Sequence, residues 1–274
     1  MLMSEKSLSK WWRRLALVAG SVLALGVVQN GEGAPRGQKI KIEVKLVVPT
    51  ERVTQAVQTL GLATNSFTRE EVVYFDTADG ALLANSLILR ARWRPGGTAD
   101  STTKLRGDAD PAELTELEEQ IKPEQDWTDE TRPAISRSAN NTTLPHGLVQ
   151  QVIHGAADAA PLFNAVQRGL VATHLKDFPW KNLRRYGPCA AEVWKENIGL
   201  RGFAEPVTVE RWHLQKGATN LDLLEISAKA KMQNEAAARD WVKTFYQAAA
   251  DAGLSRPPSQ SKTRIVMDFF KPGI

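Results

Sequence analysis

The chain has 274 residues, of which 42% are hydrophobic, 24% are charged and 7% are aromatic, and it contains one cysteine. This composition is typical of a globular protein and excludes a disordered, a collagen-like or a disulfide-stapled chain. The length suffices for one large domain or two small ones with a sizeable core. The formal net charge of +4 arises from 35 basic and 31 acidic side chains.

The first 34 residues have the three-part form of a secretory signal. Basic residues precede an apolar run at 15–28, and a small, polar stretch at 29–34 follows it. The run is shorter than the roughly 20 apolar residues that a membrane span needs. We therefore predict a cleaved signal peptide over 1–34, a secreted or periplasmic location and no stable membrane span after cleavage. An uncleaved N-terminal membrane anchor is the alternative.

Removal of residues 1–34 leaves 31 basic and 29 acidic side chains, so the mature chain, 35–274, is nearly neutral. The near-neutral charge argues against nucleic-acid binding, although Arg184, Arg185 and Tyr186 form a small basic and aromatic cluster. The single cysteine, Cys189, cannot form an internal disulfide. The fold must therefore depend on its core.

Residues 39–48 alternate between apolar and charged side chains, which indicates a β-strand. Lys41, Glu43 and Lys45 share one face of this strand, and the apolar residues share the other. A short helix is expected over 51–60 because its apolar residues recur at helical spacing, and Gly61 ends it. We expect this helix to pack on the apolar face of the strand.

Further strands are expected over 70–76, 87–94 and 102–106, with another candidate at 114–121. The strand pattern weakens over 123–169. We interpret this stretch as a partly helical insertion with short helices at 148–153 and 162–166. Strand patterns resume after it, and a helix and a last segment follow. These later segments are strands at 170–176, 181–186, 190–195, 207–214 and 221–229, a hairpin turn at 217–220, a helix at 234–252 and the segment 261–270.

Charged residues recur on one face of several of these strands. Arg90, Arg92 and Arg94 share a face, as do Lys104 and Arg106, and Glu116 and Glu118 share one if that segment is extended. A charged strand face is commonly just the solvated side of a sheet. If the sheet closes into a barrel, however, these faces converge on a lumen. A lumen with both basic and acidic side chains suits a polyanion bridged by a divalent cation.

The ordered series of motifs resembles the CYTH superfamily, the triphosphate tunnel metalloenzymes. Lys41-Ile42-Glu43-Val44-Lys45 is similar to that family's first-strand Glu-x-Glu-x-Lys motif. The remaining matches follow in order: Tyr74-Phe75-Asp76-Thr77, Leu89-Arg90-Ala91-Arg92, Thr103-Lys104-Leu105-Arg106, Glu116-Leu117-Glu118, Leu224-Glu225-Ile226-Ser227 and Ser261-Lys262-Thr263-Arg264. The resemblance runs from about residue 40 to 264.

The resemblance implies an α+β fold with an antiparallel eight-stranded β-barrel (tunnel) and flanking helices. It implies phosphate or substrate binding by Lys45, Arg90, Arg92, Lys104, Arg106 and Lys262. Lys41, which departs from the family motif, adds a further basic side chain to this substrate-binding set. It implies metal binding, with Mg²⁺ or Mn²⁺ as the cofactor, by Glu43, Glu116, Glu118 and Glu225. The catalytic residues that it implies are Glu43, Lys45, Glu116 and Glu118.

Two expected glutamates are missing, because Lys41 and Ser227 stand in their places. Each loss weakens metal binding, and family members depend on metal to orient the triphosphate. The leading hypothesis is metal-dependent hydrolysis of a triphosphate or related small phosphorylated anion. The alternatives are a non-catalytic exported domain that binds polyphosphate or another anion, and a purely structural exported domain. The sequence indicates neither the oligomeric state nor the physiological substrate.

Other chemistries lack support in the sequence. The spacing of the four histidines does not resemble a zinc site. No dinucleotide-binding, P-loop or serine-hydrolase motif is present.

Overall fold

The computed structural model describes residues 39–62, 67–107, 120–195, 198–254 and 261–271. The predicted signal peptide, Glu116 and Glu118 lie outside these residues, as does most of the candidate strand at 114–121. The strands are β1 (Ile40–Val48), β2 (Thr68–Asp76), β3 (Leu87–Trp93), β4 (Asp100–Arg106), β5 (Lys122–Trp127), β6 (Ala134–Asn141), β7 (Arg184–Trp194), β8 (Thr208–Lys216) and β9 (Thr219–Met232).

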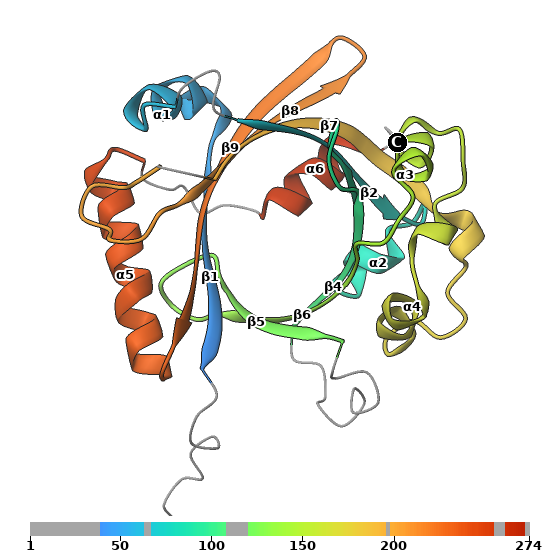
Figure 1. Cartoon of the computed structure of the whole chain (residues 1–274), viewed down its shortest axis with the longest axis horizontal. Coiled ribbons are helices and arrows are strands. Elements are labelled where there is room, and N and C mark those ends of the chain that lie inside the picture. The colour runs from blue at the N-terminus through green and yellow to red at the C-terminus, as the bar shows by residue number, and fades with distance from the viewer. Residues whose placement is uncertain (1–38, 63–66, 108–119, 196–197, 255–260, 272–274) are drawn as a thin grey trace, which may run out of the picture. The chain divides into compact units, whose positions relative to one another are not determined.

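These nine strands form a closed barrel in the order β1-β5-β6-β4-β3-β2-β7-β8-β9 (Figure 1). The prediction of eight antiparallel strands is wrong in number and in direction. A closed ring with an odd number of strands cannot alternate in direction throughout, so at least one neighbouring pair must be parallel. That pair is β1 and β5, and every other pairing is antiparallel.

The stretch that we interpreted as an insertion, 123–169, contributes β5 and β6 to the barrel wall. Pro123 obscured β5, because proline cannot donate a ladder hydrogen bond. It is tolerated because the pairing with β1 begins only at Gln125. The later part of the stretch is helical, as expected.

The strand predicted over 170–176 is also wrong, because helix α4 (Ala165–Ala172) covers its start. Asn164 caps this helix by accepting a hydrogen bond from the Gln167 backbone, and the Gln167 side chain accepts one from the Asn164 backbone. This capping box begins the helix and overrides the local apolar pattern. The other helices are α1 (Val53–Thr59), α2 (Ala81–Ala84), α3 (His146–His154), α5 (Glu235–Asp251) and α6 (Lys262–Phe270). Short 3-10 helices cover Thr50–Arg52, Ala160–Leu162 and Trp180–Asn182.

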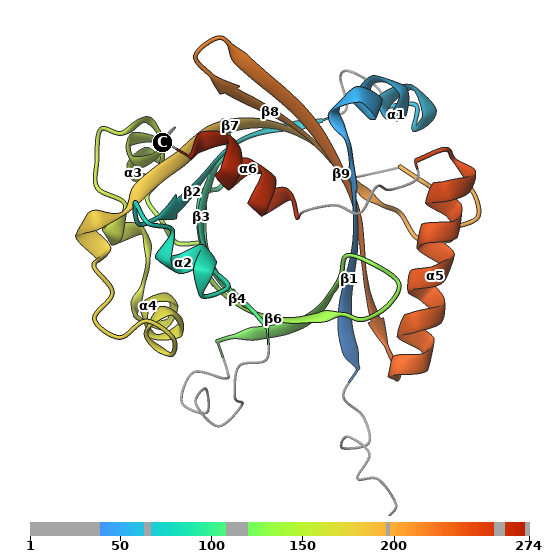
Figure 2. The ribbon, with the colours of Figure 1, turned by 180° about the vertical axis from the view of Figure 1, so that it is seen from behind.

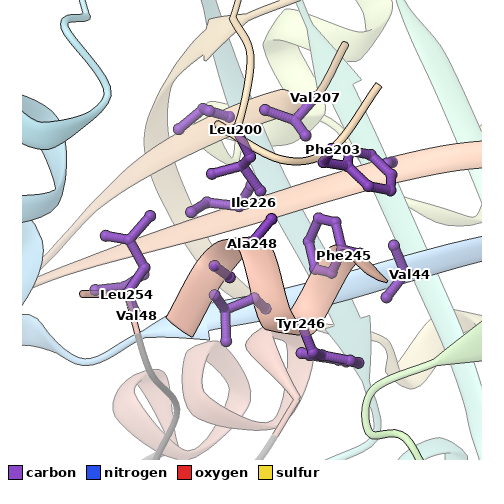
Figure 3. Packing of buried hydrophobic residues seen from close by; sticks show 14 of the residues in the cluster. Val44, Val48, Leu200, Phe203, Val207, Ile226, Phe245, Tyr246, Ala248 and Leu254 are labelled. Carbon is purple, nitrogen blue, oxygen red and sulfur yellow. The ribbon is translucent and has the colours of Figure 1, made fainter. Parts of the chain in front are cut away.

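Two apolar clusters lie on the outside of the barrel. In the first, α5 and α1 cover the outer faces of β1 and β9, where Phe245 packs near Val44 and Ile226 (Figure 3). In the second, α2, α3 and α4 cover the outer faces of β2, β3 and β4. The alternation of β1 therefore buries its apolar face under helices, as predicted, and turns its charged face inward.

A third apolar cluster lies inside the barrel and packs against α6. Val72 and Tyr74 belong to it, and they are register partners of Arg92 and Arg90, whose side chains face the lumen. Helix α6 crosses the barrel opening next to β7 and β8 in both views of the ribbon (Figures 1 and 2), and it places Val266 and Met267 in this cluster. The helix thus covers the apolar part of the lumen. Within the described part of the chain, every helix falls short of the length and apolar character that a membrane crossing requires.

Candidate functional site

The charged part of the lumen is a cavity of about 640 Å³. The side chains expected to bind phosphate all line it, and they are Lys41, Lys45, Arg90, Arg92, Lys104, Arg106 and Lys262. Glu43 and Glu225 line it as well. The strand faces identified in the sequence therefore converge on one space.

Period-2 alternation explains this convergence. On β1 every second residue faces the lumen, so Lys41, Glu43 and Lys45 follow one another along the cavity wall. Across the barrel, the register of β3 and β4 pairs Arg90 with Thr102, and both line the cavity.

Three carboxylates form a group on the wall made by β1 and β5. One ligand oxygen from each of Glu43, Glu124 and Asp126 lies within 4.8 Å of the others. The parallel register places Glu43 opposite Asp126, and Glu124 precedes Asp126 by one inward-facing position on β5. Asp126 is buried, and cationic side chains of the lumen approach both of its carboxylate oxygens. We call these three residues the carboxylate group.

Basic residues of the lumen pair with this group. Lys104 Nζ lies 2.6 Å from Asp126 Oδ2, Arg106 Nε lies 3.3 Å from the same oxygen, and Lys45 Nζ lies 2.5 Å from Glu43 Oε2. Burial and the neighbouring charge of Lys45 lower the pKa of Lys104 to about 8. Burial by itself would raise the pKa of Glu43, but the nearby lysines hold it well below its ordinary value. Glu43 is therefore ionised at neutral pH, which is the form in which a carboxylate binds a cation.

A second ionic cluster attaches the start of α6 to the barrel. Lys262 Nζ pairs with Glu210 on β8, and it lies 2.7 Å from Glu225 Oε1 on β9. It also lies 4.4 Å from the ring centre of Trp212. Burial would raise the pKa of Glu210, but Lys262 lowers it to about 2. Glu225 was expected to bind metal, but it forms this ion pair and is not one of the carboxylate group.

The two arginines of β3 differ in their partners. Arg92 Nε lies 3.1 Å from Asp100 Oδ1, and its Nη1 lies 3.8 Å from Glu70 Oε2. Arg90 forms no ion pair with a described carboxylate, and its buried Nε lacks a hydrogen-bond acceptor in the described part of the chain. Arg90 is therefore the less neutralised of the two.

One matched motif has a structural role. Asp76 is fully buried and accepts hydrogen bonds from the backbone amides of Thr77, Leu82 and Leu83. It thereby holds the turn that leads into α2. Cys189 is buried as well, and burial raises the pKa of its thiol to about 12, so the thiol stays protonated at neutral pH.

The sequence interpretation missed Glu124, Asp126, Glu210 and Lys229. The first two lie in the stretch taken for an insertion, although Lys122, Glu124 and Asp126 alternate there as the charged residues of β1 do. This alternation was the available signal. Glu210 and Lys229 lie in predicted strands, and the same alternation puts Lys229 on the face of Glu225 and Ser227.

The carboxylate group fits a hard divalent cation by its chemistry. Mg²⁺ and Mn²⁺ prefer carboxylate oxygens, and three converge here from two adjacent strands. The carboxylate group differs from the set of metal ligands that the resemblance implied. Among the described residues, Glu43 is the one that belongs to both.

The chain is similar to known proteins in its structure. No family model and no curated protein matches the sequence. A solved structure of a candidate adenylate cyclase from Bacillus halodurans is similar, with a TM-score of 0.53 and 17% identity over 83% of this chain and 97% of that chain. A candidate adenylyl cyclase from Hippeastrum, described as having a dominant triphosphatase activity, is similar with a TM-score of 0.50 and 15% identity over 82% of this chain and 94% of that one. At these identities the likeness shows a shared fold alone.

Proposed function

We propose that this tunnel-fold chain binds a triphosphate or a related small phosphorylated anion in its lumen and hydrolyses it with the help of a divalent cation. One observation carries the proposal: the seven basic side chains expected to bind phosphate line one cavity of about 640 Å³ together with Glu43 and Glu124, and Asp126 lies beside these two carboxylates. A cavity lined in this way favours a ligand with several negative charges over an apolar one.

The basic side chains would neutralise and position the phosphoryl groups. Arg90 offers a guanidinium without an ion-pair partner among the described carboxylates, so it can bind phosphate without breaking an existing pair. Lys45, Lys104 and Arg106 surround Asp126, and they can each contact an anion while the carboxylate remains between them. The pairing with Asp126 thus holds three cations in place before the ligand arrives.

Glu43, Glu124 and Asp126 would hold the cation, which we propose to be Mg²⁺ or Mn²⁺. A bound divalent cation neutralises charge on phosphate oxygens and favours attack by water. The carboxylates of this chain would fix the cation beside the basic wall, where the anion binds.

The test is to incubate the purified full-length protein with tripolyphosphate and either Mg²⁺ or Mn²⁺ and to follow phosphate release. We expect release that needs the metal and falls at least about tenfold in Glu43→Gln, because this variant removes one ligand charge. Asp158→Asn, at an exposed site outside the cavity, is the matched control and should behave as the wild type. Absence of release with both metals would exclude the hydrolase.

The second candidate function is metal-independent anion binding. It is favoured by one observation, that every member of the carboxylate group already pairs with a lysine. Calorimetric titration with tripolyphosphate separates the two functions. Binding that persists unchanged in EDTA, without hydrolysis when metal is restored, supports the binding protein, whereas binding that EDTA abolishes supports the hydrolase.

We further propose that the chain is exported after cleavage near residue 34. The basic residues and apolar run of the N-terminal segment support this. Amino-terminal sequencing of the protein recovered from the periplasm or the medium tests it. A mature chain that still begins at Met1 would contradict cleavage.

A further inference from the structure

Lys229 lies between two members of the carboxylate group. Its Nζ is 3.4 Å from Glu43 Oε1, 3.1 Å from Glu124 Oε1 and 3.4 Å from Glu124 Oε2. The antiparallel register of β1 and β9 pairs Lys229 with Glu43, so the two side chains start from neighbouring positions on the inner face. Backbone pairing therefore fixes where this ammonium can reach.

The oxygens that Lys229 contacts are those that the other lysines leave open. Lys45 forms an ion pair with Glu43 Oε2, and Lys104 forms one with Asp126 Oδ2. Lys229 contacts Glu43 Oε1 and both carboxylate oxygens of Glu124. Glu124 forms no other ion pair with a described residue. A cation that bound Glu43 and Glu124 together would have to use these same oxygens.

The side chain of Lys229 is also able to move away from the two carboxylates into solvent. It is 62% exposed, in contrast to 12% for Lys45 and 14% for Lys104. A long, flexible lysine side chain can move into solvent at little cost beyond its ion pairs. The buried lysines have no such freedom.

We propose that Lys229 is a tethered cation, whose ammonium occupies the position of a divalent ion between Glu43 and Glu124 and competes with that ion for the two carboxylates. The chain without ligand then binds divalent cations weakly, and tight binding requires Lys229 to swing outward. The inference rests on the proposed function only in treating the carboxylate group as a cation site.

The test measures Mn²⁺ binding to the purified full-length protein without any phosphate compound, by electron paramagnetic resonance of the free ion. Lys229→Met keeps an unbranched side chain and removes the charge. We expect it to bind Mn²⁺ at least about tenfold more tightly than the wild type, since a positive charge a few ångströms from the ion is lost.

Lys231→Met is the matched control. Lys231 lies one inward-facing position further along β9, is exposed, and forms no ion pair with a described carboxylate. Its variant should stay within about twofold of the wild type, because a charge in solvent is screened. The double variant Lys229→Met/Glu124→Gln should lose the gain.

Equal Mn²⁺ affinity in the wild type and Lys229→Met would overturn the proposal. An equal gain in Lys231→Met would overturn it, because the effect would then be a general one of removing positive charge. A gain that survives in the double variant would also overturn it, because the effect would then not involve Glu124. Phosphate release from tripolyphosphate with Mn²⁺, measured on the same preparations, reports on the proposed function independently. Near-ultraviolet circular dichroism confirms that each variant is folded.

Discussion

At the scale of single residues, the cavity contains basic side chains with different degrees of neutralisation. Arg90 is unpaired among the described carboxylates, Arg92 is neutralised by Asp100 and Glu70, and Lys104 shares Asp126 with Lys45 and Arg106. The anion must therefore compete with internal carboxylates for most of these cations. Arg90 is the side chain that can bind the anion without first losing an ion pair to a described carboxylate.

Lys104→Met should weaken tripolyphosphate binding about tenfold. The change removes one ammonium from the cavity wall but keeps the side-chain length, and a charge-assisted hydrogen bond contributes about 1.5–3 kcal/mol. Calorimetric titration at pH 7 measures the effect. Lys176→Met removes the same charge from an exposed site outside the cavity and should leave the affinity unchanged. Identical affinities for both variants would mean that Lys104 does not contact the anion.

At the scale of secondary-structure elements, α6 determines how much of the lumen is open. It packs Val266 and Met267 on the apolar inner faces of β2, β7 and β8, and it leaves the charged wall exposed to the cavity. Lys262, at its first turn, is buried between Glu210 and Glu225. The ion pairs attach the helix, and the apolar contacts orient it.

Lys262→Met should destabilise the protein by about 3–5 kcal/mol. Breaking a buried ion pair by removing one partner leaves uncompensated charge, here on two glutamates. Urea unfolding at pH 7 gives the value. Arg264→Met on the same helix removes an exposed ion pair with Asp268 and should cost less than about 1 kcal/mol. If the two variants were equally stable, Lys262 would not anchor α6.

Stability should fall in acid as Glu210 loses its charge. The pKa of Glu210 is lowered in the folded state, from 4.5 to about 2, so its stabilising contribution is complete above pH 4.5 and is lost as the pH falls towards 2. Proton linkage sets an upper limit of about 3 kcal/mol for this contribution. Urea unfolding at pH 6, 4 and 3 measures the loss, and the Lys262→Met variant should lose less over the same range. An identical decline in both proteins would assign the acid sensitivity to other groups.

At the scale of the whole molecule, the closed barrel surrounds the proposed site, so a ligand bound there should stabilise the folded state. A ligand that binds only the folded state adds about 2.7 kcal/mol of stability at a concentration 100 times its Kd. We therefore expect the midpoint of thermal unfolding to rise steadily with tripolyphosphate concentration. Lys104→Met should need about tenfold more ligand for the same rise. A midpoint that does not depend on tripolyphosphate, at any concentration up to 10 mM or so, would argue against a site in the lumen.

Much of the cavity wall could be predicted from the sequence. Alternation of charged and apolar residues is a local property with a period of two, and it correctly assigned the inner faces of β1, β3 and β4. The ordered motifs added the expectation of a β-barrel, and the structure has a closed barrel, with nine strands in place of the eight expected. Helix α4 was misjudged, because a capping box and tertiary packing outweighed the local pattern over 170–176.

The sequence by itself thus determined which side chains share a face on β1, β3 and β4, because that depends only on neighbouring residues. Tertiary structure decided which strands meet. The parallel pairing of β1 with β5 brings Asp126 beside Glu43, although 83 residues separate them in the chain, and the pairing with β9 brings Lys229 to the same place. Such long-range register depends on how the barrel closes, and no local pattern encodes it.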